Sequence, residues 1–162
     1  MDIKWNKDTK RIEGVGSERF QPRGATTGFM ELVVEAPGQA PVTLRAHHMK
    51  FGYMGPAALL ETFFEADEEG SSLTFMFFKP LAANTAYLIG NPFIGGDADV
   101  LGSFHYIGEG GGGVGDGVLH ITEFVQSNQG LGFTGRFRFH YNVEGGTVSV
   151  SCESFNVEHI SD

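Results

Sequence analysis

The chain has 162 residues, of which 41% are hydrophobic, and this composition is typical of a soluble globular protein with a sizeable core. The formal net charge is −9, and residues 51–135 carry one basic residue, Lys79, against ten acidic ones. This charge balance argues against nucleic acid and against an anionic membrane surface as partners.

We expect a single domain over residues 1–162, with a polar, turn-rich N-terminal segment over residues 1–27. Residues 1–14 are charged and lack the apolar stretch of a secretory signal. Cys152 is the one cysteine, so no intrachain disulfide can form. These features predict a cytoplasmic protein, and the alternatives are a processed mature form or export by another route.

Short apolar stretches separated by turn residues predict strands along most of the chain. In chain order these strands cover residues 3–5, 30–35, 42–51, 73–79, 86–89, 100–107 and 118–125. Residues 56–69 predict one short helix instead, because Pro56 suits a first helical turn and Leu59 and Leu60 recur as Phe63 and Phe64. The same residues would also serve in a strand.

The clearest pattern is a β-hairpin near the end of the chain. Apolar and polar residues alternate from Phe133 to Tyr141 and again after the turn signal Glu144-Gly145. A two-residue turn fixes a register in which apolar residues face apolar ones and polar residues face polar ones: Val143 with Gly146, Tyr141 with Val148, Phe139 with Val150, Phe137 with Cys152, His140 with Ser149, Arg138 with Ser151 and Arg136 with Glu153. The chain as a whole therefore predicts a mainly β fold, an antiparallel β-sandwich or a flattened barrel, with the short helix near 56–69.

A glycine-rich stretch covers residues 108–117 and contains a formal G-x-G-x-x-G. In a dinucleotide site these glycines lead into a helix, whereas Val118 here begins a predicted strand. We therefore interpret the stretch as a flexible hairpin loop. A loop at the end of a sheet is also a suitable place for ligand binding.

Two groups of residues are candidates for ligand binding. Arg136, Arg138 and His140 form a basic stripe on the polar face of the predicted hairpin, which suits a carboxylate, a sugar or an acidic partner. Asp97, Asp99 and Asp116 lie in or beside predicted loops, and Asp97 with Asp99 is a weak alternative site for Ca²⁺. The alternative for the stripe is an ordinary solvated sheet face.

Other patterns do not indicate a catalytic or metal site. His105, His120 and His140 would hold zinc only if their strands converged, and His47 and His48 are expected on opposite faces of one strand. Cys152 lies on the apolar face of the hairpin, which predicts a buried, inert thiol. No nucleophile motif is present, so the sequence favours a non-enzymatic protein without a cofactor or a resident metal.

Two functions are consistent with these patterns. The first is a non-enzymatic binding or interaction module that uses glycine-rich loops, with a small molecule, a glycan or a protein as its partner. The second is a small β-barrel that holds an apolar ligand, or an isomerase or cyclase built on such a barrel. A filled core favours the first and a large apolar cavity favours the second. Either protein could form a homo-oligomer, because exposed strand edges need cover.

Overall fold

The computed structural model describes residues 2–6, 11–15, 23–94 and 96–161, with side chains from residue 23 onward. This part of the chain is mainly β, as the sequence predicts. Its elements are β1 (Asp2–Asn6), β2 (Arg11–Val15), β3 (Ala25–Glu35), β4 (Val42–Arg45), β5 (His48–Met54), β6 (Ala57–Phe63), β7 (Ser72–Phe77), β8 (Thr85–Ile89), the 3-10 helix η1 (Pro92–Ile94), β9 (Val100–His105), β10 (Gly113–Val114), β11 (Asp116–Ser127), β12 (Gly130–Val143) and β13 (Gly146–Ile160).

One large sheet contains most of these strands. Within the described residues, eleven strands follow the order β4-β3-β13-β12-β11-β8-β9-β7-β6-β5, with β10 paired to β9. Neighbouring strands are antiparallel except for β8 and β9, which pair in parallel. A separate hairpin of β1 and β2 lies near β9 through β2, and it includes the strand predicted over residues 3–5.

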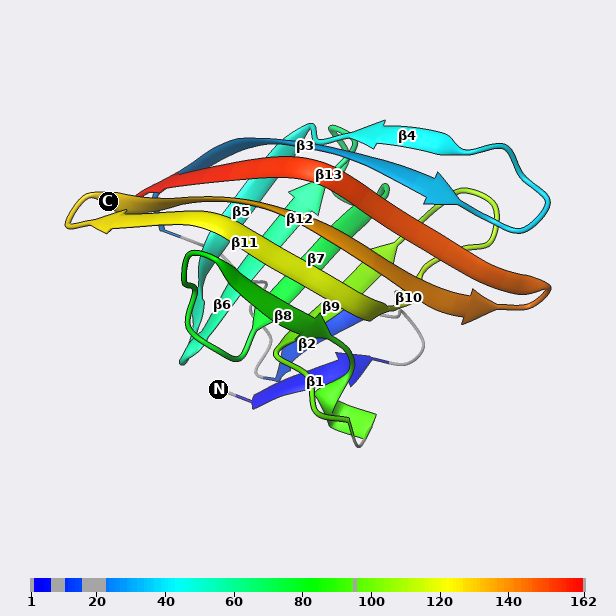
Figure 1. The fold of residues 1–162 in the computed structure, drawn as a ribbon, viewed down its shortest axis with the longest axis horizontal. Helices are drawn as coiled ribbons and strands as arrows, with labels where there is room; N and C mark the ends of the chain where they lie inside the picture. Colours follow the sequence, from blue (N-terminus) through cyan, green and yellow to red (C-terminus); the bar gives the residue numbers. More distant parts are fainter. Residues whose placement is uncertain (1, 7–10, 16–22, 95, 162) are drawn as a thin grey trace.

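The sheet folds back on itself into two layers. In Figure 1, β3, β13, β12 and β11 run side by side in the upper layer, and β5, β6, β7 and β9 cross beneath them. β3 and β5 contact each other where the two layers meet, and the backbone N–H of Phe51 donates to Thr26 Oγ1 at 3.0 Å. No strand ladder joins β3 to β5 in the described residues, so the sheet is a flattened structure that is not closed into a barrel.

Aromatic rings in contact fill the space between the two layers. The Phe75 ring centroid lies 5.0 Å from that of Phe137, and Phe51 of the lower layer lies 5.8 Å from Phe133 of the upper layer. Further contacts link Phe137 to Phe155 at 5.8 Å and Phe77 to Tyr87 at 5.6 Å. Edge-to-face and tilted contacts of this kind stabilise a core beyond the burial of apolar area alone.

The predicted hairpin is present as β12 and β13, and its register is confirmed from the turn to Phe137. Val143 pairs with Gly146, and Phe137 pairs with Cys152. The register then shifts between Gly135 and Phe137, so Arg136 lies beside a β-bulge in β13 and has no single partner in the ladder. The predicted pairing of Arg136 with Glu153 is therefore replaced by this bulge.

The predicted helix over residues 56–69 is wrong, because Ala57–Phe63 forms strand β6 and a turn region follows it. Strand β6 is buried on both faces. Leu60 joins the main core, while Leu59 packs with Met76 and Leu101 in a second apolar cluster. A strand that is buried on both faces has no polar alternation, so its apolar run resembles a helix in the sequence.

The strand predicted over residues 42–51 is two strands. β4 pairs with β3, whereas β5 pairs with β6, so the chain crosses from one layer to the other near Ala46. The N–H of Ala46 donates to the carbonyl of Met30 in one layer, and the next N–H, that of His47, donates to the carbonyl of Phe63 in the other. The break therefore lies where the backbone changes partners.

Candidate ligand-binding face

The solvent-facing side of β11, β12 and β13 carries most of the residues that the sequence marks as candidates, and we call it the outer face. On β12 the odd-numbered residues from Phe133 to Tyr141 point into the core and are buried. The even-numbered residues point outward, since successive side chains of a strand alternate between faces. Residues that are paired across antiparallel strands share a face, so the ladder defines rows across the outer face.

Three rows form the basic half of the outer face. Arg138 lies between Val118 of β11 and Ser151 of β13, and His140 lies between Asp116 and Ser149. The third row places His120 of β11 beside Arg136. The structure thus brings Asp116 together with the predicted basic stripe.

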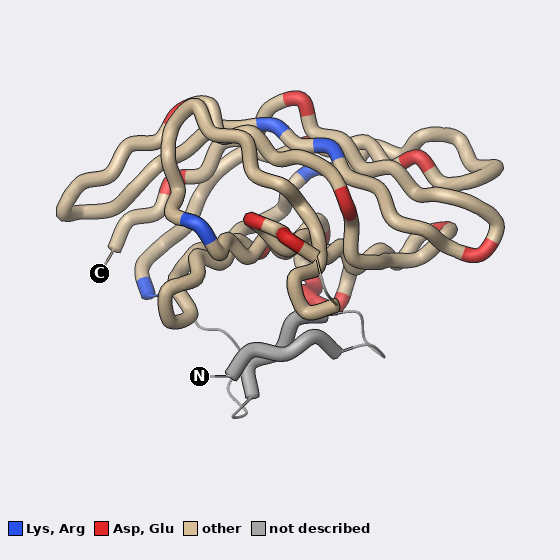
Figure 2. Tube along the Cα trace, turned by 60° about the horizontal axis from the view of Figure 1, so that its bottom comes forward, with Lys and Arg blue, Asp and Glu red and all other residues tan. Residues whose placement is uncertain are grey.

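The two arginines of this half are exposed. Among the described residues, neither Arg136 nor Arg138 forms an ion pair. Figure 2 shows acidic positions on several strands and loops of the chain. An exposed guanidinium group can bind a carboxylate through two parallel hydrogen bonds.

The two aspartates of the loop before β9 have different surroundings. Asp99 accepts the N–H of Leu88 at 2.8 Å, and its other oxygen pairs with Lys79 Nζ at 2.5 Å. The hydrogen bond from Leu88, followed by that from Lys79, lowers the pKa of Asp99. Asp99 therefore anchors the loop to β8, while Asp97 is exposed. In the described part of the chain, no group of three or more His, Cys, Asp or Glu side chains is arranged to hold a metal ion.

The histidines do not converge on one point. His105 ends β9 in the other layer, and His120 and His140 lie in different rows of the outer face. His47 and His48 do not point to opposite faces as predicted, because β5 begins only at His48, and their Nδ1 atoms are 3.1 Å apart. The Nε2 atom of His48 lies 3.1 Å from Glu68 Oε1.

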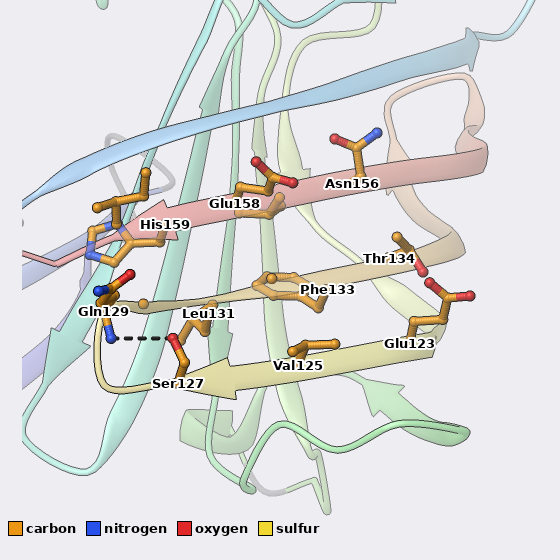
Figure 3. Close-up of a pocket in the computed structure, with 14 residues that line it drawn as sticks. Glu123, Val125, Ser127, Gln129, Leu131, Phe133, Thr134, Asn156, Glu158 and His159 are labelled. Atoms are coloured by element: carbon orange, nitrogen blue, oxygen red, sulfur yellow. Dashed lines mark hydrogen bonds between the residues drawn. The ribbon is translucent and has the colours of Figure 1, made fainter.

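A groove that the sequence does not indicate lies at the other end of the outer face. It has a volume of about 440 Å³ and runs along β12 between β11 and β13, where Gly130 and Gly132 provide no side chains. Figure 3 shows its labelled residues on the three strands. It is lined by Glu123, Val125, Ser127, Gln129, Gly130, Leu131, Gly132, Phe133, Thr134, Asn156, Val157, Glu158, His159 and Ile160.

Three rows make up this groove half of the outer face. Gly132 lies between Val125 and Glu158, and Gly130 lies between Ser127 and Ile160; the third row consists of Glu123, Thr134 and Asn156. The exposed fractions of Val125 and Ile160 are 69% and 64%. The groove thus has apolar walls and carboxylates at its rim, which suit an apolar chain that ends in a cation. The signal in the sequence was the spacing of Gly130 and Gly132 on the polar face of a strand.

The glycine-rich stretch is a loop only over residues 108–112, and the remainder, which the sequence also predicts as loop, lies in or between strands of the sheet. Gly113 and Val114 form β10 on β9, and Asp116 begins β11. A Cβ at Gly113 would lie 2.5 Å from the Tyr141 ring, and one at Gly115 would lie 2.2 Å from the Phe139 ring. These glycines therefore allow the backbone to pack directly on core rings.

The predicted burial of Cys152 is confirmed. Its side chain is 3% exposed, and burial raises the pKa of the thiol to about 11. The thiol is therefore protonated and unreactive at neutral pH.

Comparisons with known proteins leave this face as the main guide to function. In the described residues, no helix is both long enough and apolar enough to span a membrane. No family model, no curated protein and no solved structure matches the chain.

Proposed function

We propose that the protein is a non-enzymatic interaction module that binds its partner through the outer face of β11, β12 and β13. The observation that carries this proposal is the pair of exposed arginines, Arg136 and Arg138, which have no ion-pair partner in the described residues and lie on the same face as the groove. Arginine binds carboxylates through two parallel hydrogen bonds, so this half of the face suits an acidic group.

The packed interior supports this function over the apolar-ligand barrel. Rings from both layers are in contact across the space where such a ligand would bind, as the contact of Phe75 with Phe137 shows. Small barrels that hold a ligand keep that space open. Gly113 and Gly115 of the glycine-rich stretch, which the sequence predicts as a binding loop, pack directly on the rings of Tyr141 and Phe139.

The test is an NMR titration of the isotope-labelled protein with a hexaglutamate peptide. We expect shifts of the backbone amides in the basic half of the outer face. The variant Arg138→Glu should lose the response, because it reverses one of the two unpaired charges. The control is Arg45→Glu, which makes the same charge change on β4, where Arg45 pairs with Glu31. This control should respond as the wild type does.

Two results would contradict the proposal. One is a peptide response that lies outside the outer face or is absent at millimolar peptide. The other is an equal loss of the response in Arg138→Glu and in Arg45→Glu, because that would show an effect of net charge and not of a site.

A further inference from the structure

The basic half and the groove half of the outer face are complementary to each other, and we infer that the partner of this face is a second copy of the chain. This inference rests on the proposed function and names its partner. One half presents Arg136 and Arg138, and the other presents Glu123 and Glu158 beside strand positions that lack side chains. Two copies would bring each half against the opposite half, which is the arrangement of an isologous two-fold dimer.

The register of β12 determines where the two-fold axis lies. An axis in the interface that crosses the strands at Gly135 places residues at equal distances on either side of Gly135 opposite one another. Arg138 then lies over Gly132 of the second copy, and Arg136 lies over Thr134. A long side chain thus meets a position without one, and His140 meets Gly130 in the same way.

The neighbouring strands agree with the same axis. In the row of Gly132, Glu158 of the second copy flanks the position that Arg138 occupies; in the row of Thr134, Glu123 flanks Arg136. β11 and β13 each contain one extra residue at a bulge near the axis. This extra residue places Glu123 in the row of Thr134 and Glu158 in the row of Gly132. The two arginines therefore meet the two glutamates without any change of backbone.

Apolar residues of β11 also meet in this arrangement. Val118 is 51% exposed and faces the 69% exposed Val125 of the second copy, while His120 faces Glu123. Removing these exposed valine side chains from water is favourable for the free energy of association. The pairing of valine with valine therefore supports the same register. In the neighbouring register, one copy is shifted by two residues along β12. Arg136 would then lie opposite Gly132, but Glu123 would lie opposite Glu123 of the second copy near the axis.

The size of the face predicts a dimer that dissociates on dilution. Three strands over the eleven residues from Gly130 to His140 span roughly 14 Å by 35 Å, or about 500 Å² on each copy. A standard interface buries about 800 Å² on each partner. We therefore expect a monomer–dimer equilibrium that depends on protein concentration.

A charge-swap experiment by sedimentation equilibrium tests this inference. The first variant combines Arg136→Glu with Arg138→Glu, and the second combines Glu123→Arg with Glu158→Arg. Each alone places like charges across the interface, so its dimer dissociation constant should rise by about tenfold or more. An equimolar mixture should restore dimerisation, because positions 123, 136, 138 and 158 are all acidic in the first variant and all basic in the second.

The control combines Glu109→Arg with Glu144→Arg, which makes the same charge change as the second variant at exposed positions away from the six rows. It should dimerise as the wild type does. A wild type that stays monomeric at every accessible concentration would overturn the inference. So would a mixture that stays monomeric while both variants are folded, or two variants that each dimerise like the wild type.

A variant that changes no charge provides an independent check. Gly132→Val should fold, because a Cβ at this position has ordinary contacts at 3.5 Å and beyond, but it would fill the space that Arg138 of the second copy occupies. We expect a weaker dimer with unchanged thermal stability of the monomer, and an unchanged dimer would overturn the inference. If dimerisation fails while hexaglutamate still binds the basic half, the proposed function stands and only the partner is wrong.

Discussion

The substitution Gly115→Ala tests whether the glycine-rich stretch is packed or flexible. A Cβ at this position would lie 2.2 Å from Cδ2 and 2.9 Å from Cγ of Phe139, well inside ordinary carbon contact. The Phe139 ring cannot swing away, because it is fully buried and stacked on Phe137 at 5.9 Å. Rings of Phe75 and Phe104 lie within 6.4 Å of it. The added methyl group must therefore displace core atoms.

Overpacking of this kind costs about 1–3 kcal/mol of the free energy of unfolding. For a chain of this length each kcal/mol lowers Tm by about 2–4 °C, so we expect Tm to fall by roughly 2–12 °C. Differential scanning calorimetry measures this shift. The matched control is Gly96→Ala, because a Cβ at Gly96 meets only one atom at 3.6 Å and should change stability by less than about 0.5 kcal/mol.

A double-mutant cycle assigns the effect to the ring. In the background of Phe139→Val the space beside Gly115 is larger, so Gly115→Ala should cost less there than in the wild type. A Tm of Gly115→Ala equal to that of Gly96→Ala would show that the stretch is free of the core. An equal cost in both backgrounds would show that the Phe139 ring is not the group that the added methyl displaces.

Two further predictions concern buried polar groups. The folded-state pKa of Cys152 is raised from an ordinary value of 9.0 to about 11, so its contribution to stability is complete below pH 9 and is lost as the pH rises to about 11. Urea unfolding between pH 9 and about 11 should show a larger loss in the free energy of unfolding for the wild type than for Cys152→Ala. An equal pH dependence of the two proteins would contradict this prediction. The hydroxyl of Tyr87 donates to the carbonyl of Pro80 at 2.7 Å and accepts the N–H of Ala82 at 2.9 Å. Tyr87→Phe should therefore lower the free energy of unfolding by about 1 kcal/mol at an unchanged denaturant slope, and no change would show that water replaces both bonds.

The strands that the sequence predicts best are those with one buried face and one solvent-exposed face. Strands β12 and β13 alternate clearly, so their register from the turn to Phe137 follows from the residues alone. Strand β6 does not alternate, because Leu59 and Leu60 are buried in two different clusters, and the sequence therefore suggests a helix. The bulge beside Arg136 interrupts the ladder of β13 with β3 as well as that with β12, and a hairpin taken by itself contains only the second of these ladders.

The candidate site shows a similar division. The basic stripe of Arg136, Arg138 and His140 follows from alternation on one strand. The groove depends on side chains from three strands and on the absence of side chains at Gly130 and Gly132, so it becomes visible only when the strand order is known. The sequence placed Asp116 in a loop, whereas pairing with β12 sets it beside His140.

Native mass spectrometry of gently purified protein distinguishes a filled core with a binding outer face from a barrel that holds an apolar ligand. For the first we expect masses of the bare monomer and of the bare dimer, with the dimer fraction rising with protein concentration. An added mass that disappears on denaturation and persists in the variants Arg138→Glu and Gly132→Val would contradict this expectation. Such a mass would belong to a ligand held inside the sheet, as the apolar-ligand barrel requires.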